Sequence, residues 1–200
     1  MNKPNLLFPT PVWTIQLENF NKVNEEMYNF IKGSQIKDQK GIKKSNNKGW
    51  HSKDFNMKEI EPQNFIKNIS PSIEKVITDM NWDKENQSIK ISNMWAIINT
   101  GGSTNSKHQH GNSTLSGAYY VRAPENCGDI VFYDPRPAPV FYYPTSVSSN
   151  SLNAQINSIT PKEGALILFP SYVDHSVNEN LSNDERIVIS FNVTIQSQSY

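Results

Sequence analysis

A series of short β-like runs fills the chain from Ile89 onward and constrains its fold most strongly. The five runs read IKISNMWAII, TLSGAYYV, GDIVFYD, ALILFP and RIVISFNVTI, and clusters of Gly, Asn, Pro and Ser separate them. Short strands with turn residues between them are typical of antiparallel sandwiches and barrels. We therefore expect a mainly β fold for the second half of the chain.

The last run shows which way its side chains point, because successive side chains of a strand face opposite sides. Its two sides are Ile187, Ile189, Phe191 and Val193, which are apolar, and Arg186, Val188, Ser190 and Asn192, which are largely polar. If the apolar side packs against N-terminal helices, the side with Arg186 points into the barrel, where a ligand can contact it.

Apolar residues at helical spacing precede the β-like runs. The spacing predicts a helix from Asn21 to Lys32, with Asn21 as its cap and Gly33 as its end. Two successive helical patterns meet at Ser70-Pro71, a helix start signal.

The stretch 35–54 is rich in Lys, Asn and Gly, so it is expected to be an exposed loop, with the sequence GWHS at 49–52 as the exception. We expect one domain over residues 1–200, in which a helical and loop part at 1–86 packs on a β core at 87–200.

Composition excludes several classes of protein. Hydrophobic residues make up 36% of the chain and charged residues 19%, with a formal net charge of zero, which argues against disorder and against binding of nucleic acid. A single cysteine, Cys127, rules out a disulfide framework and a multi-cysteine zinc site. The sequence shows no membrane-length apolar run and no signal peptide, so a cytoplasmic protein without a membrane partner is expected.

Three of the four histidines are placed to share one metal ion. His108 and His110 lie two residues apart and project to the same side of an extended chain, and His175 follows the ALILFP run. Three such ligands occupy one face of a coordination sphere and leave positions open for substrate or oxygen. Arg186, at the start of the next run, can reach the same barrel and bind a carboxylate through paired hydrogen bonds.

The chain resembles the Fe(II)- and 2-oxoglutarate-dependent oxygenase superfamily, and more closely a group of such oxygenases found in bacteria and phages. The resemblance is carried by the blocks HQHGNSTLSGAYYV, EGALILFPSYVDHSV and RIVISFN, with support from FPTPVW and SNNKGWHS. It implies a double-stranded β-helix, a jelly-roll, cupin-like barrel with helices packed on one sheet. It also implies Fe(II) and 2-oxoglutarate as cofactors, and a bacterial or phage-infected cell as the location.

The resemblance assigns metal ligands and marks a departure. The superfamily pattern is HxD or HxE, and here His108 takes the histidine place and His110 the carboxylate place, with His175 as the third ligand. Such an all-histidine set also suits copper and zinc. In an alternative register, His110 is the first ligand and Asn112 stands in the carboxylate place.

The resemblance also implies residues that hold 2-oxoglutarate. Arg186 matches the basic residue that pairs with the distal carboxylate, and these further positions match family positions around it: Tyr120, Ser190, Asn99 and Asn105, the last two in place of tyrosines. Ser116 lies four residues before Tyr120 on the same strand face and is expected to line the same pocket. Ser190 and Asn192 are equally compatible with hydrogen bonding to buried backbone groups. His51 and Trp95 are interpreted as rim or core side chains.

The function implied is hydroxylation of a small-molecule or peptide substrate, with release of succinate and CO2. The Pro-, Tyr- and Ser-rich segment 134–153 is predicted to form a rim loop or lid over that substrate. Two alternatives stay open: a cupin-like dioxygenase that uses the three histidines without 2-oxoglutarate, and a non-enzymatic β-sandwich module for binding or virion association. The sequence fixes neither the substrate nor the oligomeric state.

Overall fold

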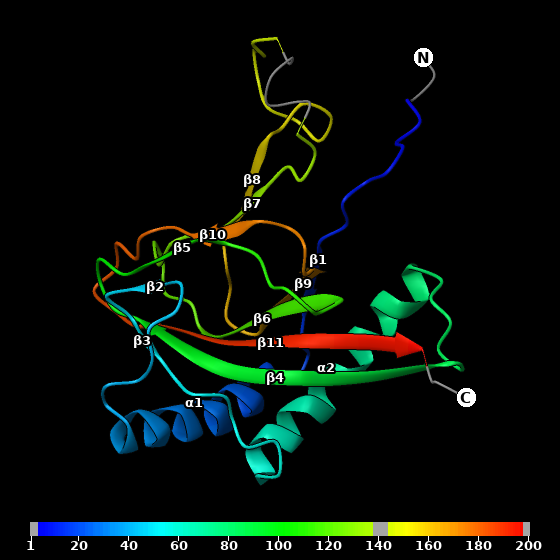
Figure 1. Ribbon diagram of the computed structural model, residues 1–200. Coiled ribbons are helices and arrows are strands. Elements are labelled where there is room, and N and C mark those ends of the chain that lie inside the picture. The colour runs from blue at the N-terminus through cyan, green and yellow to red at the C-terminus, as the bar shows by residue number, and fades with distance from the viewer. Residues whose placement is uncertain (1–3, 138–143, 198–200) are drawn as a thin grey trace.

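Two antiparallel sheets and two helices make up the computed structural model, which describes residues 4–137 and 144–197. The six-stranded sheet has the order β1 (Trp13–Gln16), β9 (Ala165–Pro170), β6 (Leu115–Arg122), β11 (Arg186–Ser197), β4 (Gln87–Asn99), β3 (Trp50–His51). The five-stranded sheet has the order β2 (Asn46–Asn47), β5 (Thr104–His108), β10 (His175–Val177), β7 (Ile130–Tyr133), β8 (Ile156–Ile159). The helices are α1 (Phe20–Lys37) and α2 (Ile60–Asp79), and both pack on one face of the six-stranded sheet (Figure 1). This confirms the predicted mainly β fold with helices on one sheet.

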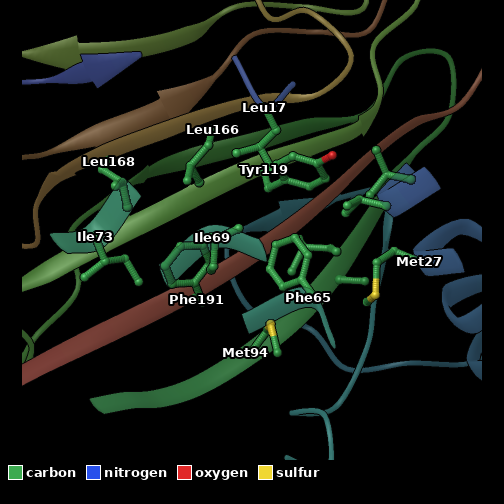
Figure 2. Close-up of a cluster of buried hydrophobic side chains, with 14 of the residues drawn as sticks. Leu17, Met27, Phe65, Ile69, Ile73, Met94, Tyr119, Leu166, Leu168 and Phe191 are labelled. Atoms are coloured by element: carbon green, nitrogen blue, oxygen red, sulfur yellow. The ribbon is translucent and has the colours of Figure 1, made fainter. Parts of the chain in front are cut away.

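The larger core lies between the helices and the six-stranded sheet. Phe65 of α2 contacts Tyr119 and Phe191 with ring centroids 5.1 and 6.3 Å apart. Figure 2 shows these rings with Met27 of α1 and Leu166 of β9 in one apolar cluster. Burial of each such side chain is worth roughly 1.5–3 kcal/mol, so this layer fixes the sheet against the helices.

The alternation along β11 is confirmed. Its apolar set lies in the helix-facing core, and its other set lines a cavity on the opposite face. A smaller apolar cluster fills part of the space between the two sheets, where Phe132 of β7 meets Phe169 of β9 in a T-shaped contact with centroids 5.0 Å apart. The inward face of β11 is therefore the floor of an internal cavity.

Helix α1 is longer than predicted. It begins at Phe20 rather than Asn21 and continues through Gly33 to Lys37. A glycine lowers helix stability by only about 1 kcal/mol relative to alanine, and Gly33 has open space around its Cα, so nothing forces the helix to end there.

Helix α2 is one helix and not two, so the predicted break at Ser70-Pro71 is wrong. The proline removes one backbone hydrogen bond at a cost of about 3 kcal/mol. The buried stripe formed by Phe65, Ile69 and Ile73 runs through this point on the sheet, and its burial outweighs that cost.

The prediction of an exposed loop over 35–54 is also wrong in part. Residues 35–37 belong to α1, and two short strands, β2 and β3, add to the edges of both sheets. Two-residue strands show no period that sequence patterning can detect. The pairing of β3 with β4 buries His51 and Ser52 and brings this segment to the cavity.

No helix in the described residues is long and apolar enough to cross a membrane. The expected cytoplasmic location, and the division of one domain at residues 86 and 87, remain predictions.

Candidate active site

A cavity of about 650 Å³ lies between the two sheets. Side chains of both sheets line it: the inward face of β11 and β4 on one side, and β5 and β10 on the other. The segment from Ile42 to Asp54 forms a further wall. Its size falls within the range of about 300–1,000 Å³ that is usual for ligand sites.

The structure brings the three predicted histidines together in this cavity. His108 ends β5 and pairs in register with His175, the first residue of β10, while His110 follows two residues after His108. One ring nitrogen from each histidine lies within 4.8 Å of those of the other two. Among the described residues this is the one group of three or more His, Cys, Asp or Glu side chains with metal-ligand spacing.

Hydrogen bonds to Nδ1 orient all three imidazoles in the same way. His108 Nδ1 lies 2.7 Å from the Ser106 carbonyl, His175 Nδ1 lies 3.0 Å from the Val173 carbonyl, and His110 Nδ1 lies 2.6 Å from the amide oxygen of Asn192. Since these oxygens only accept, each Nδ1 carries the proton and each Nε2 keeps a free lone pair. The donor set is therefore three neutral imidazole nitrogens, which suits Fe(II) as well as copper and zinc.

Burial keeps His175 and His110 neutral. It lowers the pKa of His175 from 6.5 to about 3, with further lowering from the neighbouring His108, and it also lowers the pKa of His110. A neutral histidine is the form that binds a metal ion.

The stability of the metal-free protein should therefore fall in mild acid. The unfolded chain takes up a proton at His175 near pH 6.5 and the folded protein only near pH 3. The contribution of neutral His175 to the free energy of unfolding is therefore fully present above pH 6.5 and is lost as the pH falls below it. We expect a loss of about 2 kcal/mol from His175 between pH 7.5 and 5. Urea unfolding gives the free energy of unfolding of the wild type and of His175→Gln at both pH values. The loss due to His175 is the decrease from pH 7.5 to 5 in the wild type minus the decrease in the variant, and equal decreases would contradict the prediction.

Arg186 is almost completely buried, at 1% exposure, and lines the same cavity as the histidines. Its Nη1 donates to the carbonyls of Cys127 and Gly128 at 2.7 and 3.1 Å. No carboxylate among residues 4–137 and 144–197 forms an ion pair with it. Burial lowers the pKa of this guanidinium, yet arginine stays charged at neutral pH. A buried cation without a protein anion is unfavourable and creates a strong preference for an anionic ligand.

Two predicted cosubstrate residues share this part of the cavity with Arg186. Tyr120 is buried on β6 near Arg186. Burial raises the pKa of the Tyr120 phenol, and the positive charge of Arg186 lowers it by a smaller amount. Ser190 lies four residues along β11 from Arg186 on the same inward face. The predicted residues Arg186, Tyr120 and Ser190 therefore line one cavity.

Three other predicted cosubstrate residues lie elsewhere or are already bonded. Ser116 is fully buried and lies 2.9 Å from His110 Nδ1, on the side of that ring away from Nε2. Asn99 donates to Asn105 Oδ1 at 2.9 Å. Asn105 lines the cavity, whereas Asn99 and Ser116 do not belong to its lining.

The alternative ligand Asn112 is exposed in the turn after β5, with a positive φ of 61°. It does not belong to the lining of the cavity that holds the three histidines. The arrangement therefore favours His108 with His110 over His110 with Asn112.

Sequence reasoning missed three residues of the site. Asn192 contacts His110, and its inward parity on the last run was the available signal. His51 and Trp95 line the cavity with their rings stacked at 5.8 Å, and Trp95 lies 5.7 Å from His110. Both were interpreted as rim or core side chains, because no local pattern shows that β3 pairs with β4.

The predicted lid, the segment 134–153, lies in part outside the described residues, which do not include 138–143. The β7–β8 hairpin that carries this segment projects from the sandwich (Figure 1). The described parts of the segment line a different depression, together with residues 5–10.

Comparison with known proteins shows the family of this chain. Residues 93–192, half of the chain, match the model of a family described as "Putative 2OG-Fe(II) oxygenase". The match runs from the middle of β4 into β11 and contains all three histidines and Arg186. The chain belongs to this 2OG-Fe(II) oxygenase family. It is therefore a non-haem iron enzyme by family, and the family uses Fe(II) and 2-oxoglutarate.

Solved structures share the fold. A prolyl-4-hydroxylase from Pseudomonas putida has a TM-score of 0.65 at 8% identity, over 95% of this chain and 94% of that one. A Trichoplax adhaerens prolyl hydroxylase in complex with a peptide fragment of a hypoxia inducible factor gives 0.62 at 14% identity, over 92% and 83%. HygX from Streptomyces hygroscopicus, with nickel, 2-oxoglutarate and hygromycin B bound, gives 0.58 at 10% identity, over 92% and 83%. These likenesses confirm the double-stranded β-helix. Curated protein sequences give no significant match.

Proposed function

We propose that this protein is an Fe(II)- and 2-oxoglutarate-dependent dioxygenase that hydroxylates a small-molecule or peptide substrate. The balanced reaction is R–H + O2 + 2-oxoglutarate → R–OH + succinate + CO2. The observation that carries the proposal is the buried Arg186, a cation without a protein carboxylate in the same cavity as three neutral histidines. A dicarboxylic keto acid satisfies both, because one carboxylate reaches the metal and the other reaches the guanidinium.

His108, His110 and His175 would hold the metal through their Nε2 atoms. When bound with 2-oxoglutarate, Fe(II) supplies the activation of O2 that is coupled to loss of CO2. Because the three ligands are neutral, the protein adds no negative charge to the ion, and the dianionic cosubstrate supplies the balancing charge.

The cosubstrate would lie along the inward face of β11. The guanidinium of Arg186 binds the distal carboxylate through the donors that Cys127 and Gly128 leave free, with charge-assisted hydrogen bonds. Tyr120 and Ser190 flank the same place and can donate hydroxyl hydrogen bonds to that carboxylate. Asn105 belongs to the neighbouring wall, and Asn99 donates a hydrogen bond to it from outside the cavity lining. We assign Ser116 to the support of His110 rather than to the cosubstrate.

The substrate would approach over β4 and β3. The rings of Trp95 and His51 extend from His110 toward the segment 42–54, which carries Lys44 and Asp54 at the cavity. The indole N–H of Trp95 is buried without a partner among the described residues, so a substrate acceptor that reaches it would be favoured. Related folds accept a peptide fragment and hygromycin B, which supports either kind of substrate.

The test uses the purified protein with Fe(II) and 2-oxoglutarate. Anaerobic mixing should give the visible charge-transfer band of a metal-bound keto acid, and admission of air should release succinate slowly even without substrate. A protein that binds iron but gives neither the band nor succinate would contradict the proposal. That result would favour the cupin-like reaction without 2-oxoglutarate.

A further inference from the structure

His110 differs from the other two histidines in what holds its Nδ1. Backbone carbonyls of Ser106 and Val173 hold His108 and His175, whereas the side chain of Asn192 holds His110 at 2.6 Å. A backbone carbonyl is fixed by the local chain, and any residue at its position supplies it. The orientation of His110 depends on a side chain that substitution can remove.

The amide of Asn192 is itself oriented by its neighbours. Its Nδ2 donates to Asn93 Oδ1 at 2.9 Å, so its Oδ1 must face His110. Ser116 Oγ donates to the same Oδ1 at 2.9 Å and lies 2.9 Å from Ser171 Oγ. We call Asn93, Asn192, Ser116 and Ser171 the His110 support network.

Three adjacent strands hold three members of this network in the six-stranded sheet, and Ser171 directly follows β9. Asn192 of β11 pairs in register with Asn93 of β4 on one side and with Ser116 of β6 on the other. The side chains of Ser116, Ser171 and Asn192 are 0, 1 and 7% exposed, so water cannot easily replace a lost partner. The network is therefore specific: removal of one member leaves a buried polar group unpaired.

We infer that Asn192 is the positioning residue of the metal site: it fixes the proton of His110 on Nδ1 and thereby directs the Nε2 lone pair to the shared centre. The inference rests on the proposed role of the histidines as metal ligands. Without the Asn192 acceptor, Nδ1 of His110 keeps Ser116 Oγ at 2.9 Å. A hydroxyl can donate as well as accept, so it does not fix the proton on Nδ1, and a ring that carries its proton on Nε2 leaves the donor set. Outer contacts of this kind typically change metal affinity by about 10–100-fold.

The experiment measures binding of Co(II) alone, without oxygen or 2-oxoglutarate, by its visible d–d absorption. Asn192→Ala should weaken Co(II) binding about 10–100-fold and change the intensity of the band, because one ligand is misdirected. Asn192→Asp keeps an acceptor in the same place and adds a negative charge behind the imidazole, so it should restore binding at least to the wild-type level. Thr194→Val, on the same strand but outside the His110 support network, is the matched control and should bind within twofold of wild type.

Thermal unfolding of the metal-free variants shows whether each is folded. If Asn192→Ala does not fold, Asn93→Ala provides the test, because it frees the Asn192 amide to turn over; it should weaken Co(II) binding several-fold. Folded Asn192→Ala that binds Co(II) within twofold of wild type would overturn the inference. Equal weakening in Asn192→Ala and Asn192→Asp would overturn it as well, since the acceptor oxygen would then not be the cause.

These outcomes are distinct from failure of the proposed function. Loss of Co(II) affinity in Asn192→Ala, with no succinate from the wild type, retains the positioning role and rejects the 2-oxoglutarate reaction. Succinate from the wild type, with unchanged affinity in Asn192→Ala, does the reverse.

Discussion

Replacement of His108 by Ala should abolish succinate formation and weaken Fe(II) binding by more than about 100-fold. His108 supplies one of three ring nitrogens that meet within 4.8 Å, and no carboxylate in the described residues shares that cluster to replace it. Loss of a direct ligand must exceed the upper end of the effect of outer contacts, which is about 100-fold. Isothermal titration with Fe(II) under nitrogen, followed by a succinate assay in air, measures both effects.

Two further variants make this prediction specific. Asn112→Ala should bind Fe(II) like the wild type, because Asn112 is exposed and does not line the cavity of the three histidines. His51→Ala removes another buried histidine from the same cavity and should also leave Fe(II) affinity unchanged. If His108→Ala retains iron and Asn112→Ala loses it, the alternative register with His110 and Asn112 is correct.

Replacement of Arg186 by Met should weaken 2-oxoglutarate binding about 100-fold while Fe(II) still binds. Removal of one partner from a buried, hydrogen-bonded charge pair costs about 3 kcal/mol, which is roughly two orders of magnitude in Kd. Methionine keeps an apolar stem of similar length, so the change acts mainly on charge. Anaerobic titration of the Fe(II)-loaded protein with 2-oxoglutarate, followed by its charge-transfer band, gives the dissociation constant.

Arg122→Met is the matched control for this change. Arg122 ends β6 on the exposed side, where its guanidinium lies 4.5 Å from the Tyr28 ring, so its loss should not affect 2-oxoglutarate. Arg186→Lys keeps the charge and should retain part of the affinity. Wild-type affinity in Arg186→Met would rule out the distal carboxylate as its partner and would leave the three-histidine reaction without 2-oxoglutarate as the better explanation.

The sequence predicted the parts of the fold that have a strong period. Strict alternation in the last run placed Arg186 and Ser190 on the cavity side and Phe191 on the helix side, and the structure agrees. Two-residue spacing brought His108 and His110 to one side of the chain. A period of two is a direct property of an extended backbone, so few tertiary contacts are needed to read it.

Other features depend on tertiary contacts that no local pattern encodes. Pro71 lies inside one continuous helix because apolar residues before and after it are buried against the sheet. His51 enters the cavity through a strand of only two residues. Ser116 was expected beside the cosubstrate from its parity with Tyr120, and that parity is compatible with its actual contact to His110. The position of a residue along a strand predicts the face on which its side chain lies. Which side chains it contacts there depends on how the strands and sheets assemble.

The central position of β11 has a consequence for how this enzyme can diversify. The strand is held between β4 and β6, carries part of the main apolar core on one face and presents Arg186, Ser190 and Asn192 on the other. A substitution on either face therefore disturbs stability and chemistry together. Substitutions that change the substrate without loss of stability are therefore expected at the edge of the cavity. The segment 42–54 lies there and is not part of β11. Laboratory evolution toward a new substrate should accordingly accumulate its changes there and leave β11 untouched.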